Sequence, residues 1–291
     1  MGELLLMPPF VLGLLFIGAT FHCGWNLLVK RASEKQVFIW SALAFGSLCF
    51  SPLLFFNALF PPFIWLFVLA SAAVETTYYV ILARAYEHGD FSLVYPLARG
   101  TAPALLAVWA MLFLGDRPGL IGLVGIAVII CGLALVGGKS WWQLRKTASV
   151  TTSAVALALS VACCISVYSA IDAAAVHHVN PLPFTVAVLG VSAILFTPFI
   201  FLYYGYQKVT IEWRVHWRSL IFAGLFMLLS YMLALKSYSL AHISYVGAIR
   251  EMSIVFAAFI GWRWLGEDFG VIRVVGAVLI FVGILVIAVA G

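Results

Sequence analysis

The stretch LARAYEHGDFSLVYPLARG, residues 82–100, recurs in altered form as LKSYSLAHISYVGAIRE, residues 235–251. Each stretch joins the end of one apolar segment to the start of the next. Each also places an arginine at an equivalent position, Arg99 in the first stretch and Arg250 in the second. The two halves of the chain are therefore predicted to be copies of one unit that share a fold.

The correspondence continues toward the end of each half. The tripeptide LGD at Leu114 is matched by LGE at Leu265, and the glycines that follow also match. These glycines are Gly125 and Gly132 in the first half and Gly276 and Gly283 in the second. Small residues at this spacing lie on one face of a helix and let backbones approach. We expect close helix packing there, within the fold or between protomers.

The composition indicates a membrane protein. Hydrophobic residues make up 65% of the chain and charged residues 9%, and the mean hydropathy is +1.13. So few charges cannot cover a water-soluble surface. A transmembrane helix needs ~20 apolar residues, so the chain has room for about ten spans and little else. Every span should be a helix, because unpaired backbone groups in lipid are too costly.

The apolar segments fall into two groups around the polar stretch KSWWQLRKTAS, residues 139–149. We expect a first five-helix unit over residues 1–140, a central loop over 141–151 and a second unit over 152–291. The expected spans are 10–29, 37–56, 63–86, 93–114, 119–137, 152–174, 183–205, 217–239, 245–265 and 270–290. Because five is odd, the second unit enters the membrane from the opposite side. The prediction is an all-α membrane protein of two inverted repeats, the architecture of alternating-access carriers.

The net charge of +5 comes from basic residues spread over loops rather than from one patch, so nucleic-acid binding is not expected. Basic residues concentrate in alternate loops: Lys30, Arg31, Lys35, Lys139, Arg145, Lys146, Lys208, Arg214, Arg218, Arg263 and Arg273. The other loops offer little beyond Arg117. These basic loops should face the cytoplasm of a bacterium, with both termini outside its inner membrane. The opening MGELLLMPPF lacks Lys and Arg, so no cleavable signal peptide is expected.

Several motifs resemble one known family. The first span carries an AxxHxxWN pattern, the fourth contains YPLARG, and LGD or LGE closes the fourth and ninth spans. The residues of the first pattern are Ala19, His22, Trp25 and Asn26. With two five-helix halves, the whole chain resembles the EamA-type drug/metabolite transporter superfamily. The resemblance implies a secondary transporter, with export of amino acids or related metabolites as the leading function. It also implies cytoplasmic termini, where the charge pattern predicts the opposite.

Arg99 and Arg250 are the first candidates for a substrate site. Charged side chains at membrane depth are costly and usually face a cavity or the bundle interior. As equivalent residues of two related halves, both should lie near the axis between them. Pro96 and Pro103 flank Arg99 and are expected to break its helix, as in the binding sites of carriers. The alternative is that both arginines lie at helix ends and reach lipid phosphates.

Glu75 is a candidate for the same site. Tyr78 and Tyr79 follow it by three and four residues, a spacing that puts a carboxylate and two phenols on one helix face. We expect Glu75 and Tyr79 to contact substrate. The alternative is a carboxylate neutralised by a neighbouring arginine for packing.

Aromatic and amide side chains complete the predicted substrate site. Trp25 and Asn26 share a face of the first span with His22, and Tyr168 corresponds to Trp25 when the halves are aligned. Aromatic faces hold cations or apolar groups, and an amide can orient a polar group. Trp25, Asn26 and Tyr168 are therefore predicted to bind substrate.

Two residues are candidates for coupling transport to protons. Histidine titrates close to neutral pH, so His22 could take up and release a proton, although a packed core histidine is the alternative. Asp172 lies one turn after Tyr168 and is too short to reach the headgroups. His177 and His178 diverge as neighbours on a helix, so no metal site is expected, and neither is a cofactor.

The sequence favours a secondary transporter of a small polar metabolite. It contains no GxxxxGK[ST] motif, so ATP is not expected to drive transport directly. The arginines favour a carboxylate or phosphate, and the aromatic faces favour a compact apolar or cationic portion, which together suit an amino acid. The expected partners are this substrate and membrane lipid, and a homodimer is left open.

Three alternatives remain at this point. A carrier of cationic drugs or quaternary ammonium compounds would use Glu75 and the aromatic residues. An intramembrane lipid-modifying enzyme would need a catalytic motif, and neither GxSxG nor HExxH occurs. A non-transporting membrane subunit would explain the hydrophobicity but not the buried charges.

Overall fold

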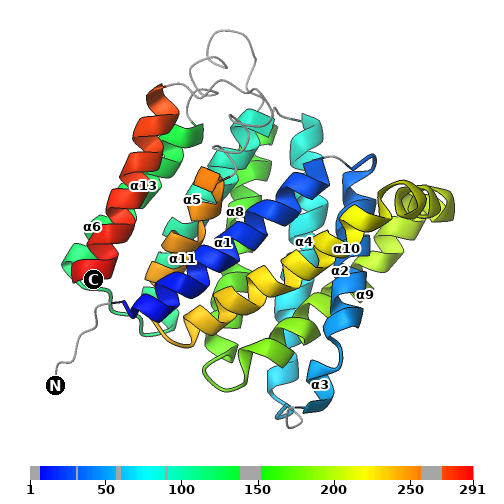
Figure 1. Ribbon diagram of the computed structural model, residues 1–291, viewed down its shortest axis with the longest axis horizontal. Helices are drawn as coiled ribbons and strands as arrows, with labels where there is room; N and C mark the ends of the chain where they lie inside the picture. Colours follow the sequence, from blue (N-terminus) through cyan, green and yellow to red (C-terminus); the bar gives the residue numbers. More distant parts are fainter. Residues whose placement is uncertain are drawn as a thin grey trace.

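A computed structural model describes residues 7–30, 32–56, 60–88, 91–137, 152–256 and 271–290 of the chain. Every regular element among these residues is a helix, which confirms the all-α prediction (Figure 1). The first half contains α1 (Pro9–Lys30), α2 (Lys35–Phe50), α3 (Leu53–Phe56), α4 (Ile64–His88), α5 (Phe91–Phe113) and α6 (Leu120–Gly137). The second half contains α8 (Thr152–Ala175), α9 (Pro181–Tyr203), α10 (Gly205–Tyr238), α11 (Ile243–Arg250) and α13 (Val271–Ala290).

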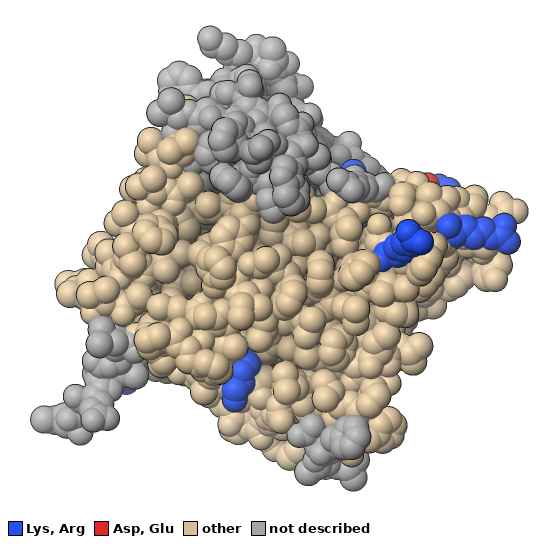
Figure 2. All heavy atoms as spheres, in the orientation of Figure 1, with Lys and Arg blue, Asp and Glu red and all other residues tan. Residues whose placement is uncertain are grey.

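The outer surface is apolar, as a membrane requires. Figure 2 shows one face of the molecule, where Lys and Arg occur at only a few places. Large apolar side chains point outward, among them Phe55, Leu120 and Leu202. Of the described helices, five are long and apolar enough to span a membrane: α1, α4, α8, α9 and α10. Shorter apolar helices occupy further expected spans within α2, α5, α6 and α13, and the total of ten spans stays a prediction.

Helices of the two halves pack against each other in matching pairs. α1 packs along α10 and α4 along α8, and exchanging the two halves converts one pair into the other. The contact of α2 with α10 corresponds in the same way to that of α4 with α9. α2 also packs on α9 and α6 on α13, each a pair of counterparts. This pairing is the one expected of two related halves that face each other.

The predicted glycine contacts lie within the chain, between α6 and α13. A Cβ added to Gly132 would lie 2.7 Å from the carbonyl oxygen of Gly276, and one added to Gly125 would lie 3.0 Å from that of Gly283. Only glycine therefore lets these backbones touch. The LGE tripeptide that precedes α13 lies outside the described residues.

Some helix boundaries differ from the expected spans. The span expected over 37–56 ends at Phe50, because Pro52 cannot continue the hydrogen bonding of α2, and the short α3 follows. The span expected over 217–239 begins earlier, since α10 starts at Gly205 and bends at His216, whose φ of −116° and ψ of 19° are not helical. Gly205 itself has a φ of +71°, which separates α9 from α10.

Candidate functional site

A cavity of about 50 Å³ lies between the two halves. Residues of α1, α4, α5, α8, α9 and α10 line it, together with the last residue of α11. The structure brings together there all the predicted site residues except Asn26 and Asp172. The predicted residues in the lining are His22, Trp25, Glu75, Tyr79, Arg99, Tyr168 and Arg250.

Arg99 reaches the cavity as part of an ion pair that joins the halves. Its Nη1 lies 3.2 Å from Oε1 of Glu251, and the two residues are 7% and 3% exposed. Such burial contradicts the alternative in which Arg99 reaches lipid phosphates. Glu251 was missed as a site residue, although its place directly after Arg250 was the available signal. The charge of Arg99 is therefore already compensated within the protein.

The expected helix break is on the other half. α5 runs continuously past Pro96 and Pro103, so the prediction that these prolines break the helix was wrong. The interruption lies after α11, where Glu251 has a φ of −73° and a ψ of −1° and its N–H bonds to the carbonyls of Ala248 and Ile249. This tightened turn presents Arg250 and Glu251 beside the cavity.

Arg250 differs from Arg99 in its partners. Its Nη1 donates to the hydroxyl of Tyr238 at 3.3 Å, and its guanidinium lies 5.7 Å from the ring centre of Tyr231. Among the described residues, no carboxylate lies within ion-pair distance of this half-buried guanidinium. Arg250 therefore offers the cavity a positive charge that no described carboxylate contacts directly.

Glu75 offers a carboxyl group to the same cavity. It is 5% exposed, and its carboxylate accepts hydrogen bonds from Ser192 Oγ at 2.8 Å and from the hydroxyl of Tyr79 at 3.3 Å. No basic side chain in the described part of the chain pairs with it, so the expected alternative of a neutralising arginine is not seen there. The predicted shared face of Glu75, Tyr78 and Tyr79 is confirmed, since all three line the cavity.

Aromatic rings form much of the remaining wall. Trp25 and Tyr168, the equivalent residues of the two halves, both line the cavity. The ring centre of Tyr168 lies 6.2 Å from that of Tyr78 and 6.3 Å from that of Tyr231. Tyr231 was missed, although the repeat held a signal for it: the offset that matches Tyr86 with Tyr238 also matches Tyr79 with Tyr231. The rings can cover an apolar group or a cation.

His22 has hydrogen-bond donors at both ring nitrogens. Nε1 of Trp25 lies 3.3 Å from its Nδ1, and Nη2 of Arg99 lies 2.5 Å from its Nε2. Indole and guanidinium nitrogens only donate, so each contact needs a lone pair on the imidazole. A neutral ring has one such lone pair and a doubly protonated ring has none. In this arrangement His22 acts as an acceptor, and its role in proton coupling stays a prediction.

Asn26 and Asp172 lie outside the lining. The amide of Asn26 donates at 2.7 Å to the carbonyl of His22 in its own helix, and Asn26 is not among the lining residues. Asp172 is fully buried and accepts a hydrogen bond from the hydroxyl of Tyr231, a lining residue. Asp172 therefore does not line the cavity itself but contacts one of its lining residues, Tyr231.

Comparisons with known proteins agree with this architecture. A search of curated proteins finds no match. A solved structure described as "Crystal structure of protein" is similar with a TM-score of 0.73 and 14% identity, over 96% of this chain and 99% of that one. At this identity the similarity concerns the fold alone. The profile of the EamA-like transporter family matches residues 9–138 and 152–289, which are the two halves of the sequence repeat. The chain is a multi-pass membrane protein that belongs to the EamA-like transporter family.

Proposed function

We propose that this drug/metabolite transporter is a secondary carrier of a small zwitterionic metabolite, with amino acids and related compounds as the leading substrates. One observation carries the proposal. The guanidinium of Arg250 and the carboxyl group of Glu75 line the same cavity, and neither group has an ion-pair partner among the described residues. A buried charge without a partner is costly. A ligand with both a carboxylate and an ammonium group supplies both partners at once.

The two arginines then have different roles. Both were expected to bind the anionic group, but Glu251 already compensates Arg99. We assign the substrate carboxylate to Arg250, whose planar guanidinium suits bidentate binding. Glu75 takes the ammonium group. Trp25 and Tyr168 cover the apolar portion between them.

The mechanism we propose is alternating access. The matched pairing of helices from the two halves supports inverted repeats, in which rocking of one group of helices against another exposes a central site to each side in turn. We place the protein in a bacterial inner membrane as an exporter, with the basic loops in the cytoplasm.

The second candidate is an efflux carrier of cationic drugs. The aromatic lining and Glu75 favour it, since a quaternary ammonium group binds to such surfaces. This ligand would, however, leave the guanidinium of Arg250 without an anion. A zwitterion, by contrast, provides a partner for both Arg250 and Glu75.

Counterflow in proteoliposomes tests the proposal. Vesicles loaded with a mixture of unlabelled neutral amino acids should take up a labelled amino acid above its equilibrium level, and empty vesicles should not. Labelled tetraethylammonium serves as the cationic probe. Exchange of that cation without exchange of any amino acid would replace the proposed substrate class with the second one.

A further inference from the structure

One end of α11 is capped by the other half of the protein. The N-cap residue His242 makes no side-chain capping bond. Instead Asp116, which follows α5, accepts hydrogen bonds from the backbone N–H of Ser244 at 2.9 Å and from its hydroxyl at 2.6 Å, and it also contacts Nδ1 of His242. The N–H of Gly119 adds a bond to the hydroxyl of Tyr245 at 3.0 Å. All these bonds join the first half to the second.

The LGD tripeptide builds this cap. Gly115 has a φ of +67°, a conformation that favours glycine, and it turns the chain sharply after α5. The N–H of Asp116 then bonds back to the carbonyl of Ala110 at 3.1 Å, which fixes the loop. The carboxylate is 4% exposed and is directed at the start of α11. The motif seen in the sequence as a repeat marker is therefore a connection between the halves.

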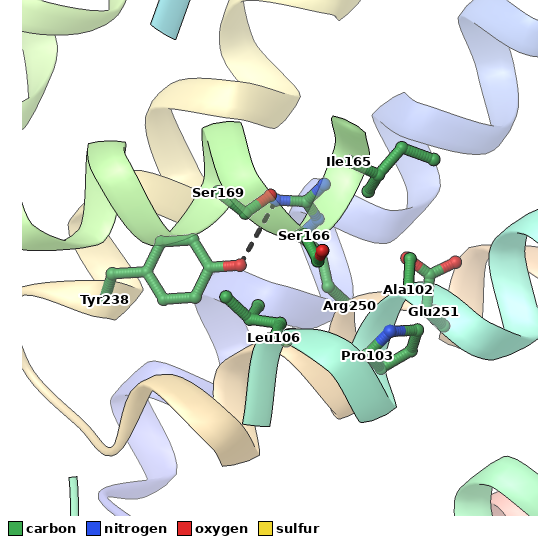
Figure 3. A pocket seen from close by; sticks show the side chains of 10 residues that line it. Ala102, Pro103, Leu106, Ile165, Ser166, Ser169, Tyr238, Arg250 and Glu251 are labelled. Atoms are coloured by element: carbon green, nitrogen blue, oxygen red, sulfur yellow. Dashed lines mark hydrogen bonds between the residues drawn. The ribbon is translucent and has the colours of Figure 1, made fainter. Parts of the chain in front are cut away.

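A smaller cavity lies between this cap and the central one. Its volume is about 10 Å³, and Figure 3 shows Leu106, Ser169 and Tyr238 around it, with Arg250 hydrogen-bonded to Tyr238. Arg250 lines both cavities.

Four helices line the smaller cavity, and along three of them, α5, α10 and α11, this cavity lies between the central one and the cap. Along α5 the chain passes from Arg99 at the central cavity to Leu106 at the small one and then to Asp116. Along α10, Tyr231 at the central cavity is followed by Tyr238 at the small one and then by the loop before α11. α11 runs in the opposite direction, from the cap through Gly247 to Arg250.

We propose that Asp116 is a positioning residue that closes this end of the transport path. By capping α11 from the other half, it holds in place the helix that ends in Arg250 and leads into Glu251. The small cavity is then the closed half of the path. When the cap separates, α11 loses its cap bonds and moves away from α5, and the path opens toward this face. The inference rests on the proposed alternating access and adds the residue that controls one side of it.

A second cap between the halves provides a matched control. Glu212 of α10 accepts the backbone N–H of Ser33 at 3.3 Å and that of Glu34 at 3.1 Å, at the start of α2. α2 and α11 begin at opposite ends of the bundle in Figure 1. α2 and α10 also pack backbone to backbone, since a Cβ on Gly46 would lie 2.5 Å from the carbonyl oxygen of Gly224. This cap therefore holds two helices that move together, and its loss should not open the path.

Labelling of a cysteine in the small cavity tests the inference without any substrate. Ser169→Cys is introduced into a variant without the native cysteines, and a membrane-impermeant cationic methanethiosulfonate is applied from the face where α11 begins. Asp116→Ala should raise the labelling rate by about tenfold, because the cap and its charged hydrogen bonds are lost. Asp116→Asn should raise it less, since an amide oxygen still accepts hydrogen bonds. Glu212→Ala should leave the rate unchanged.

Thermal unfolding of each variant separates gating from stability, because both alanine variants remove one helix cap. If Asp116→Ala cannot be purified, Ser244→Ala removes the hydroxyl donor alone and should raise the rate in the same direction. The inference is overturned if Asp116→Ala labels as slowly as its parent, or if Glu212→Ala labels as fast as Asp116→Ala. Counterflow tests the proposed substrate site independently of the labelling experiment. The role of Asp116 and the proposed substrate site can therefore be refuted separately.

Discussion

Replacing Arg250 with Gln should reduce transport strongly while the protein stays folded. The visible partners of Arg250 are one hydroxyl at 3.3 Å and the face of an aromatic ring, so its loss costs about 1 kcal/mol of stability. A substrate carboxylate would lose charged hydrogen bonds worth about 1.5–3 kcal/mol, which corresponds to a rise of about 10- to 150-fold in KM. Lys should restore part of the activity, because it keeps the charge but not the bidentate geometry.

Arg99→Gln is the matched comparison. It would leave Glu251 buried without its partner, so it should lower stability by about 3–5 kcal/mol. Counterflow kinetics at equal protein per vesicle measure the rise in KM of Arg250→Gln. Thermal unfolding in detergent measures the loss of stability of Arg99→Gln. The role of Arg250 in binding the substrate carboxylate is refuted if Arg250→Gln transports like the parent, or if it destabilises the protein as much as Arg99→Gln does.

Three further predictions concern other parts of the molecule. Glu75→Gln should weaken transport of amino acids at least tenfold but spare organic acids without an amine, as competition for counterflow would show; equal losses for both would contradict the role of Glu75. Gly132→Val should lower the thermal midpoint by several degrees, because a side chain there meets the backbone of Gly276, and an unchanged midpoint would exclude that contact. A phosphatase fused at Gly291 should be active in the periplasm, and cytoplasmic fluorescence of a matched fusion would reverse the orientation.

The repeat in the sequence was enough to predict where the main charges lie. Arg99 and Arg250 correspond across the halves, and both reach the cavity because the halves pack as counterparts. Trp25 and Tyr168 meet the same cavity for the same reason. Glu75 was found through its helical spacing to two tyrosines. Each of these predictions depends on local periodicity or on symmetry, which the sequence contains.

Contacts between segments far apart in the chain could not be predicted in this way. The pairing of Arg99 with Glu251 and the capping of α11 by Asp116 depend on how α5 and α11 approach each other. The local rule for proline also failed, since α5 continues past Pro96. Packing around a helix can outweigh the hydrogen bond that proline removes. Asn26 bonds to its own helix instead of the cavity, a choice that spacing alone does not decide.

The central claim is that Arg250 and Glu75 bind the two charged groups of one zwitterion. The most direct test measures binding of a neutral amino acid, its deaminated acid and its decarboxylated amine to the purified parent, Arg250→Gln and Glu75→Gln proteins. The parent should prefer the amino acid, Glu75→Gln should lose that preference over the acid, and Arg250→Gln should lose it over the amine. The claim is contradicted if the parent binds the amine as tightly as the amino acid, or if both variants keep the parent's order of affinities.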